Sequence, residues 1–150
     1  NLGAVRTLID AGAKTDKAGA DGRAPLHFAA LCGRLEIARS LIKGGANTNK
    51  TCQNGATALH TASALGLAEL VDLLLKSEAN VNQTGNIGET PLHWAASAGR
   101  WKVSKILLEA GAKMDKRSKN GETPEGTARR YKHPRVASLL VPNPKRQRVQ

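Results

Sequence analysis

The sequence predicts an all-α repeat solenoid built from helix-turn-helix units that are joined by hairpin-like loops. Four glycines recur at one constant interval along the chain: Gly22, Gly55, Gly88 and Gly121. Three of them open closely similar nine-residue segments, which are 22–30, 55–63 and 88–96. A fixed period of this length is typical of stacked supersecondary units, each of which buries its apolar face against its neighbours.

The same spacing divides the chain into repeats. We expect a partial repeat at 1–20, full repeats at 21–53, 54–86 and 87–119, a degenerate capping repeat at 120–140 and a basic, disordered tail at 141–150. The chain begins in the second half of a repeat without an initiator methionine, and we expect one piece of a longer array. The last repeat keeps Thr123-Pro124 but lacks the Leu-His that follows in the others, which suits a polar cap.

The first helix of each repeat has a start signal and a stop signal. Thr57, Thr90 and Thr123 can act as N-caps, because a threonine hydroxyl accepts from the unpaired amides of the first turn. After a short helical stretch comes a glycine that can take the left-handed conformation and end the helix. These glycines are Gly33, Gly66 and Gly99.

The second helix is marked by apolar spacing. In the central repeat, Leu67, Leu70, Val71 and Leu74 follow one another at i, i+3, i+4 and i+7, which places them on one helix face. Glycine again follows the second helix in three repeats, at Gly12, Gly45 and Gly111. Glu78 holds this position in the central repeat, where we expect local backbone strain.

The Thr-Pro-Leu-His opening of these repeats resembles the motif of the ankyrin-repeat family, and the resemblance covers residues 1–140. It implies ankyrin-type, L-shaped units whose first helices and hairpin tips line a concave groove that binds proteins without catalytic machinery. It also implies which residues line the groove. They are Asp21, Arg23, Leu31, Cys32, Asn54, Ala56, Ala64, Leu65, Ile87, Glu89, Ser97 and Ala98.

Two aromatic residues share one position on the first helix. Phe28 and Trp94 directly follow the histidine of their repeats. If that position faces the groove, both are anchors for a partner, because binding energy concentrates in buried aromatic side chains. The alternative is that both fill gaps between helices.

His27, His60 and His93 also share one position, and we expect them to bond the nearby threonine and backbone. No carboxylate or cysteine recurs beside them to complete a zinc site. Cys32 and Cys52 have no disulfide or metal-ligand spacing, so we expect reduced thiols. No catalytic set or phosphate-binding loop is present, and we expect neither an enzyme nor a cofactor.

The net charge of +11 is concentrated in one third of the chain. Residues 1–99 hold 9 basic and 8 acidic residues, whereas residues 100–150 hold 14 and 4. Such asymmetry suggests an acidic partner protein, nucleic acid or anionic lipid, and the alternative is a solubilising cap. The predicted basic patch comprises Arg117, Lys119, Arg129, Arg130 and Lys132.

The end of the chain predicts a location. Lys145, Arg146 and Arg148 follow Pro144 and resemble a short nuclear-import signal, and the alternative is a merely basic tail. No apolar run is long enough to cross a bilayer. We therefore expect an intracellular monomer in the cytoplasm, the nucleus or both.

The family resemblance also implies a modification at Asn82, because ankyrin repeats are substrates of an asparaginyl hydroxylase. Leu74 and Val81 match the preferred neighbours, whereas Asn80 stands where an acidic residue is preferred. The alternative is an asparagine that only bonds its own loop. The expected function is a non-catalytic scaffold that binds a protein in the groove, and the alternative is a non-specific binder of nucleic acid or anionic surfaces.

Overall fold

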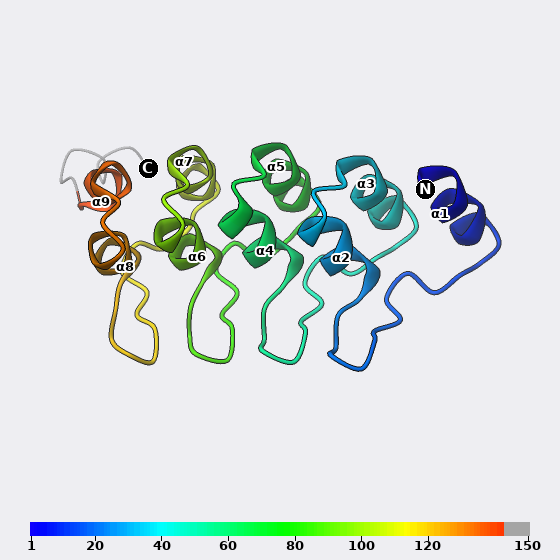
Figure 1. Ribbon diagram of the computed structural model, residues 1–150, viewed down its shortest axis with the longest axis horizontal. Coiled ribbons are helices and arrows are strands. Elements are labelled where there is room, and N and C mark those ends of the chain that lie inside the picture. Colours follow the sequence, from blue (N-terminus) through cyan, green and yellow to red (C-terminus); the bar gives the residue numbers. More distant parts are fainter. Residues whose placement is uncertain (143–150) are drawn as a thin grey trace.

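The computed structural model describes residues 1–142, which form a single row of helix pairs (Figure 1). The first helices form one layer: α2 (Pro25–Leu31), α4 (Ala58–Leu65), α6 (Pro91–Ser97) and α8 (Pro124–Arg130). The second helices form the other layer: α1 (Leu2–Asp10), α3 (Leu35–Lys43), α5 (Ala68–Lys76), α7 (Trp101–Glu109) and α9 (Pro134–Leu140). Residues 1–142 contain no strand. The predicted all-α repeat solenoid is confirmed.

Each first helix contacts the second helix of its own repeat and the first helices of its neighbours. The core consequently lies in thin layers between helices. Each first helix of a full repeat buries one leucine at the same position, which is Leu26, Leu59 or Leu92. The second helices contribute an equivalent leucine, which is buried at Leu41, Leu74, Leu107 and Leu140. Leu8 occupies the same position in α1 but is exposed, because no first helix covers α1 among the described residues.

The apolar spacing of the central second helix is reproduced in α5. Leu70, Val71 and Leu74 are buried, whereas Lys76 lies on the exposed side and pairs with Asp72 at 2.7 Å. The i, i+3, i+4 pattern therefore reports the face that α5 buries against the stack.

Two residues with a Cβ adopt the left-handed backbone conformation. Glu78, after α5, has φ = 64°, and Lys132, after α8, has φ = 60°. The strain predicted at Glu78 agrees with this conformation, because its equivalents are Gly12, Gly45 and Gly111. Lys132 was not predicted, although it lies one repeat period after Gly99. Both residues carry a steric cost that glycine avoids.

The loops between repeats extend from one side of the stack, beyond the row of first helices (Figure 1). Each loop closes on itself through a backbone hydrogen bond, such as Cys52 N–H to Ala56 O at 3.0 Å and Gly85 N–H to Glu89 O at 2.9 Å. The expected hairpin-like geometry is therefore present without strand pairing in residues 1–142.

Candidate partner-binding surface

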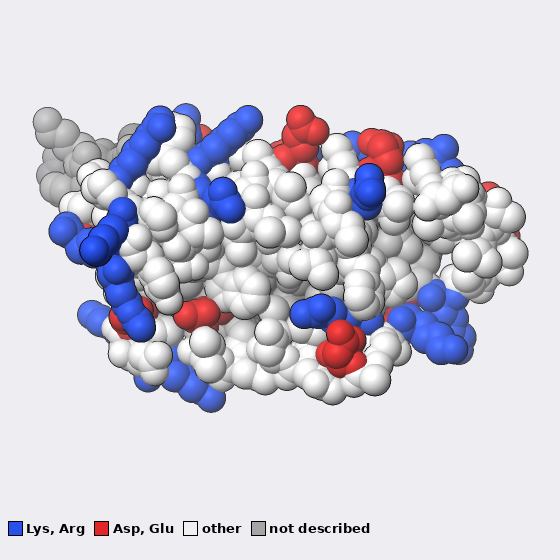
Figure 2. Space-filling model, in the orientation of Figure 1, with Lys and Arg blue, Asp and Glu red and all other residues white. Residues whose placement is uncertain are grey.

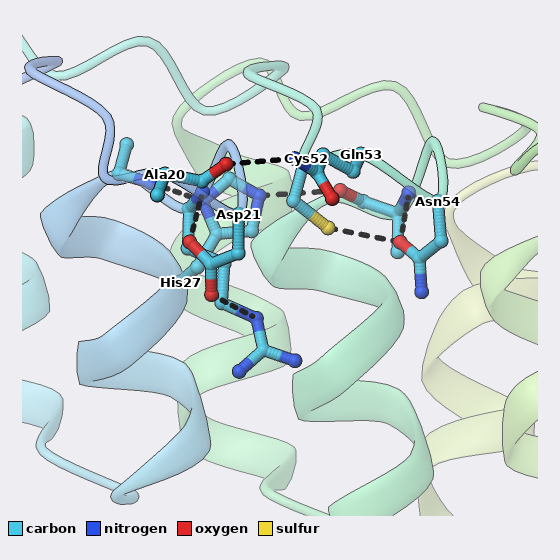
Figure 3. Close-up of polar contacts among 9 residues, drawn as sticks. Ala20, Asp21, His27, Cys52, Gln53 and Asn54 are labelled. Atoms are coloured by element: carbon cyan, nitrogen blue, oxygen red, sulfur yellow. Dashed lines mark hydrogen bonds and ion pairs between the residues drawn. The ribbon is translucent and has the colours of Figure 1, made fainter.

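The loop tips are joined to one another from repeat to repeat. Gln53 donates from its backbone N–H to Asp21 O at 3.1 Å and from its side-chain Nε2 to Ala20 O at 2.7 Å (Figure 3). The next tip repeats the backbone contact, because Asn86 N–H donates to Asn54 O at 2.8 Å. These bonds hold the tips in fixed positions relative to the helices, so the surface is organised before any partner arrives.

The repeated histidines join each first helix to the following loop. His60 Nδ1 accepts from Thr57 N–H at 3.1 Å and lies 3.0 Å from the Thr57 hydroxyl, while Nε2 lies 3.2 Å from Glu89 O. Because Nδ1 accepts a backbone N–H, the ring proton is on Nε2, which donates to the Glu89 carbonyl. The expected structural role is confirmed.

The other two histidines make the same connection. His93 bonds Thr90 and Glu122 O, the latter at 3.0 Å. His27 lies 3.2 Å from Ala56 O, and its Nδ1 accepts from Ala24 N–H in the same way, although the first full repeat has no threonine hydroxyl beside the ring. We call these three bridged rings the histidine ladder.

Burial favours the neutral form of two rings of the ladder, His60 and His93. It lowers the pKa of His60 to about 4 and also lowers the pKa of His93. A charged ring would turn Nδ1 into a second donor facing Thr57 N–H, which favours the neutral form further.

Three large apolar side chains are exposed along the predicted groove. Leu31 is 48% exposed, Leu65 42% and Ile87 56%. We name the predicted groove-lining positions, together with Trp94, the groove row. Asp21, Arg23, Cys32 and Asn54 are also exposed, and Ala64, Glu89, Ser97 and Ala98 are half-buried. Ala56 is only 3% exposed, so its methyl group does not reach the surface.

Polar residues at the tips are engaged within their own loops. Asp21 accepts from Arg23 N–H at 3.0 Å and lies 3.6 Å from the Arg23 guanidinium. The equivalent Asn54 accepts from Ala56 N–H at 3.1 Å. Ile87 occupies the same position in the third repeat, where an apolar side chain can make no such bond. Its side chain is exposed.

Trp94 contributes to the packing of the stack. Its ring meets the edge of the His60 ring of the preceding repeat, with centroids 5.3 Å apart and an interplanar angle of 73°. This contact is the gap-filling alternative, although Trp94 remains half-exposed. Phe28 has the equivalent position, but no first helix packs on that side within the described part of the chain, so its ring is exposed.

The basic patch is partly neutralised. Arg129 pairs with Glu125 at 2.7 Å, and Arg130 pairs with Glu122 at 3.1 Å. Arg117 donates to Gly121 O at 2.7 Å. Within residues 1–142, Lys119 and Lys132 are exposed and form no ion pair. Figure 2 shows Lys and Arg side chains gathered at the end formed by α8 and α9, whereas the face over the middle of the stack carries few charges.

Asn82 bridges two repeats. Its side-chain Nδ2 donates to Gly111 O at 3.1 Å, and its Oδ1 accepts from Lys113 N–H at 2.8 Å. Its backbone N–H bonds Asn80 in its own loop. The side chain therefore bonds the following repeat, unlike the own-loop contact that was the alternative to modification.

The import residues Lys145, Arg146 and Arg148 lie outside the described residues.

Tyr131 was not predicted, yet it is 52% exposed and lies one repeat period after Ala98. Counting one more period from the groove positions would have found it, because it shares the position of Cys32, Leu65 and Ala98.

Comparison with known proteins gives one family. A family model described as ankyrin repeats (3 copies) matches residues 1–85 and 78–149. No curated protein matches the chain. Among residues 1–142, no helix has the length and apolar character to cross a membrane, and no cluster of three or more His, Cys, Asp or Glu could hold a metal ion.

Proposed function

Because the chain belongs to the ankyrin-repeat family, whose repeats generally mediate protein–protein interaction, we propose that it is a scaffold that binds a partner protein through the groove row. The observation that carries this proposal is the exposure of Leu31, Leu65 and Ile87 on three successive repeats. Large apolar side chains that several neighbouring repeats expose to water are a feature of recognition surfaces.

The scaffold beneath this row supports the same function. The histidine ladder and the bonded loop tips hold neighbouring repeats in place, so a partner meets a preorganised surface and orders little on binding. The charged side chains at one tip are already paired with each other, as Asp21 is with Arg23. Over the first three full repeats, apolar contact is therefore the main contribution that the groove row can make to the free energy of binding.

The test is a double substitution, Leu65→Lys with Ile87→Lys. If these residues are central contacts, partner binding weakens by about 2–4 kcal/mol, or roughly 30- to 1000-fold, while the helical content is unchanged. Leu8→Lys is the matched control, because Leu8 is also an exposed leucine but lies on α1 away from the row. A folded double variant that retains every partner captured by the wild type would refute the proposal.

A second function is favoured by the exposed Lys119 and Lys132 and by the charge at the α8 and α9 end. This end would attract nucleic acid or an anionic surface without sequence reading, and such binding falls steeply with salt. Titration with duplex DNA at several salt concentrations tests it. The groove double variant should bind DNA as the wild type does.

We also propose that the protein acts inside the cell and that Lys145, Arg146 and Arg148 direct it to the nucleus. A large fluorescent cargo fused to residues 136–150 should accumulate in nuclei and lose this property on Lys145→Ala with Arg146→Ala. A cytoplasmic signal from the unaltered fusion would contradict the proposal.

Asn82 is the proposed site of hydroxylation. Both ends of its amide are bonded to the next repeat, so a modifying enzyme must first release the loop. Mass spectrometry of the protein isolated from cells should find one added oxygen on the Asn82 peptide. An unmodified peptide from cells that contain the hydroxylase would argue against this site.

A further inference from the structure

The groove row continues into the last repeat, where its chemistry changes. Tyr131 ends α8 as Cys32 ends α2 and Ala98 ends α6. Arg130 lies one repeat period after Ser97 and takes the position of Leu31 and Ala64. The apolar and small residues of the first three repeats thus give way to an exposed aromatic ring and a cation, and the Arg130 guanidinium carbon lies 5.5 Å from the centre of the Tyr131 ring.

The charges at this end do not cancel. Glu122 and Glu125 are matched by Arg130 and Arg129. Lys132 follows directly and has no ion pair in the described part of the chain. It lines a surface hollow of about 500 Å³ together with Arg129, His133, Pro134, Ala137 and Ser138. An anionic group arriving beside Tyr131 therefore meets positive charge that is not yet paired.

Lys132 also stands where its equivalents are glycines. Its φ of 60° matches the conformation of Gly33, Gly66 and Gly99, and a side chain there makes the backbone less favourable than glycine does. A Cβ at Gly33, Gly66 or Gly99 would meet a side chain of the following repeat, whereas no described repeat follows α9. The Lys132 side chain therefore has room, and it is exposed.

The other repeats hold fewer cations beside the groove row. Arg23, at the first tip, is paired with Asp21. Glu89, at the third tip, would repel a carboxylate. Arg34, just after α2, is also exposed and outside the ion pairs of residues 1–142. Among the described first helices, only α8 is followed directly by an exposed aromatic residue and an unpaired lysine, which are Tyr131 and Lys132.

We propose that the protein segment bound along the groove row carries acidic side chains at the end that lies over α8, where a carboxylate pairs with Lys132 beside Tyr131. The inference rests on the proposed function, because it assigns a direction to the same bound segment. Apolar residues cover Leu31, Leu65 and Ile87, and the acidic end fixes the direction in which the segment lies. Complementary charge at one end of an apolar contact sets orientation and on-rate.

The experiment is selection of random peptides on the intact protein. Packed helices are about 8–10 Å apart, so four repeats span roughly 30 Å, which an extended peptide of about 10 residues covers. A library of about 12 random residues is therefore suitable. The expected peptides combine an apolar stretch with Asp or Glu grouped at one end.

Lys132→Gly tests the assigned cation without straining the fold, because glycine suits the conformation. It should weaken the selected peptides by about fivefold at low salt and flatten the dependence of affinity on salt. Tyr131→Ala should weaken them by about tenfold. Glu78→Gly is the matched control, since it makes the same kind of change after α5 and should leave affinity unaltered.

The outcomes separate the two proposals. If no selected peptide loses binding on Leu65→Lys with Ile87→Lys, the proposed function fails and the inference fails with it. If peptides depend on those residues but show no acidic end and bind Lys132→Gly equally well, the function stands and the inference is overturned. Binding that requires Lys132 but not Leu65 and Ile87 also overturns it, because the cation would then act apart from the row.

Discussion

The second and third full repeats differ from the last repeat in how the first helix begins. In α4 and α6 the histidine ring accepts from the capping threonine and donates to the next loop. Gly126 takes the place of this histidine in α8, and there the Thr123 hydroxyl accepts from Gly126 N–H at 3.2 Å. The residue at this repeat position thus bonds the next repeat in the middle of the stack, where it is His60 or His93. In the last described repeat it is Gly126, which takes part only in the cap of α8.

This difference predicts where the stack is most easily broken. The ladder places polar bonds inside the layers between repeats, where an unpaired donor or acceptor is costly. A change in the ladder should therefore affect two repeats at once. A change at the equivalent position of α8 should affect only the last described repeat.

The largest expected effect is that of His60→Ala. It removes a buried ring, leaves Thr57 N–H without a partner and takes one of two donors away from the Glu89 carbonyl, which still accepts from Gly85 N–H. The free energy of unfolding should fall by about 3–5 kcal/mol. His133→Ala is the control, because that ring is half-buried and makes one bond, 3.0 Å long, to Ser97 O. It should cost about 1 kcal/mol. Urea midpoints measure both, and equal losses would contradict the role of the ladder.

Acid should weaken the same region. The folded pKa of His60 is about 4, below the value of 6.5 that an unfolded chain would have. Between these values the unfolded chain binds the proton first, so stability falls as pH drops from 6.5 and is fully regained above it. The loss should reach about 3 kcal/mol by pH 4, and His93 acts in the same direction.

The measurement is the unfolding free energy of the wild type and of His60→Ala between pH 7 and pH 5, where most carboxylates stay charged. The wild type should lose more stability than the variant over this range. Parallel curves would mean that His60 titrates alike in both states.

Asn82→Asp should have a smaller effect. The change keeps the acceptor for Lys113 N–H but loses the donor to Gly111 O and places a negative charge near that carbonyl. We expect a loss of about 1–2 kcal/mol in the urea-derived free energy. An aspartate already occupies the equivalent position in the first repeat, where Asp16 accepts from Asn47 N–H at 3.0 Å. Asp16→Asn should therefore not destabilise the protein, and a loss there would contradict the comparison.

The structural features that could be predicted from the sequence are those whose residues recur in most repeats. The helix pairs, the glycine stops and the bonding of His60 follow from positions that recur with the same chemistry. Where one repeat departs from the motif, pattern reading was weaker. Tyr131 and the backbone of Lys132 were overlooked because the last repeat lacks Leu-His.

Other features depend on neighbours that a linear sequence does not show. Ala56 was placed on the surface by its tip position, yet its carbonyl accepts from His27 and its methyl group is buried. Charge counting treated Arg129 and Arg130 as available cations, whereas Glu125 and Glu122 pair with them. The inter-repeat bonds of Asn82 likewise require the stacked geometry.

Ser104→Ala tests the effect of a buried hydroxyl group that has no hydrogen-bond partner in the described structure. Ser104 is fully buried at a position where the other second helices carry Val5, Ala38, Val71 and Ala137, and its hydroxyl has no partner in the described structure. Replacing it with alanine removes this unpaired group and improves helix propensity, so stability should rise by about 1 kcal/mol. A lower urea midpoint for the variant would mean that the hydroxyl is bonded in solution.

The smallest expected effect compares the two left-handed residues, Glu78 in the centre and Lys132 in the last repeat. Glu78→Gly removes the steric cost of a Cβ at φ = 64°, while its carbonyl still accepts from Asn49 Nδ2 at 3.1 Å. The gain should be about 0.5–1 kcal/mol, because the added entropy of glycine in the unfolded chain offsets part of it. Lys132→Gly should gain no more than this, since α8 and α9 have a neighbouring repeat on only one side in the described structure and couple to fewer interfaces. Urea midpoints with equal slopes measure both variants. A lower midpoint for Glu78→Gly would show that the Glu78 carboxylate has a stabilising partner in solution and that the strain argument fails at this position.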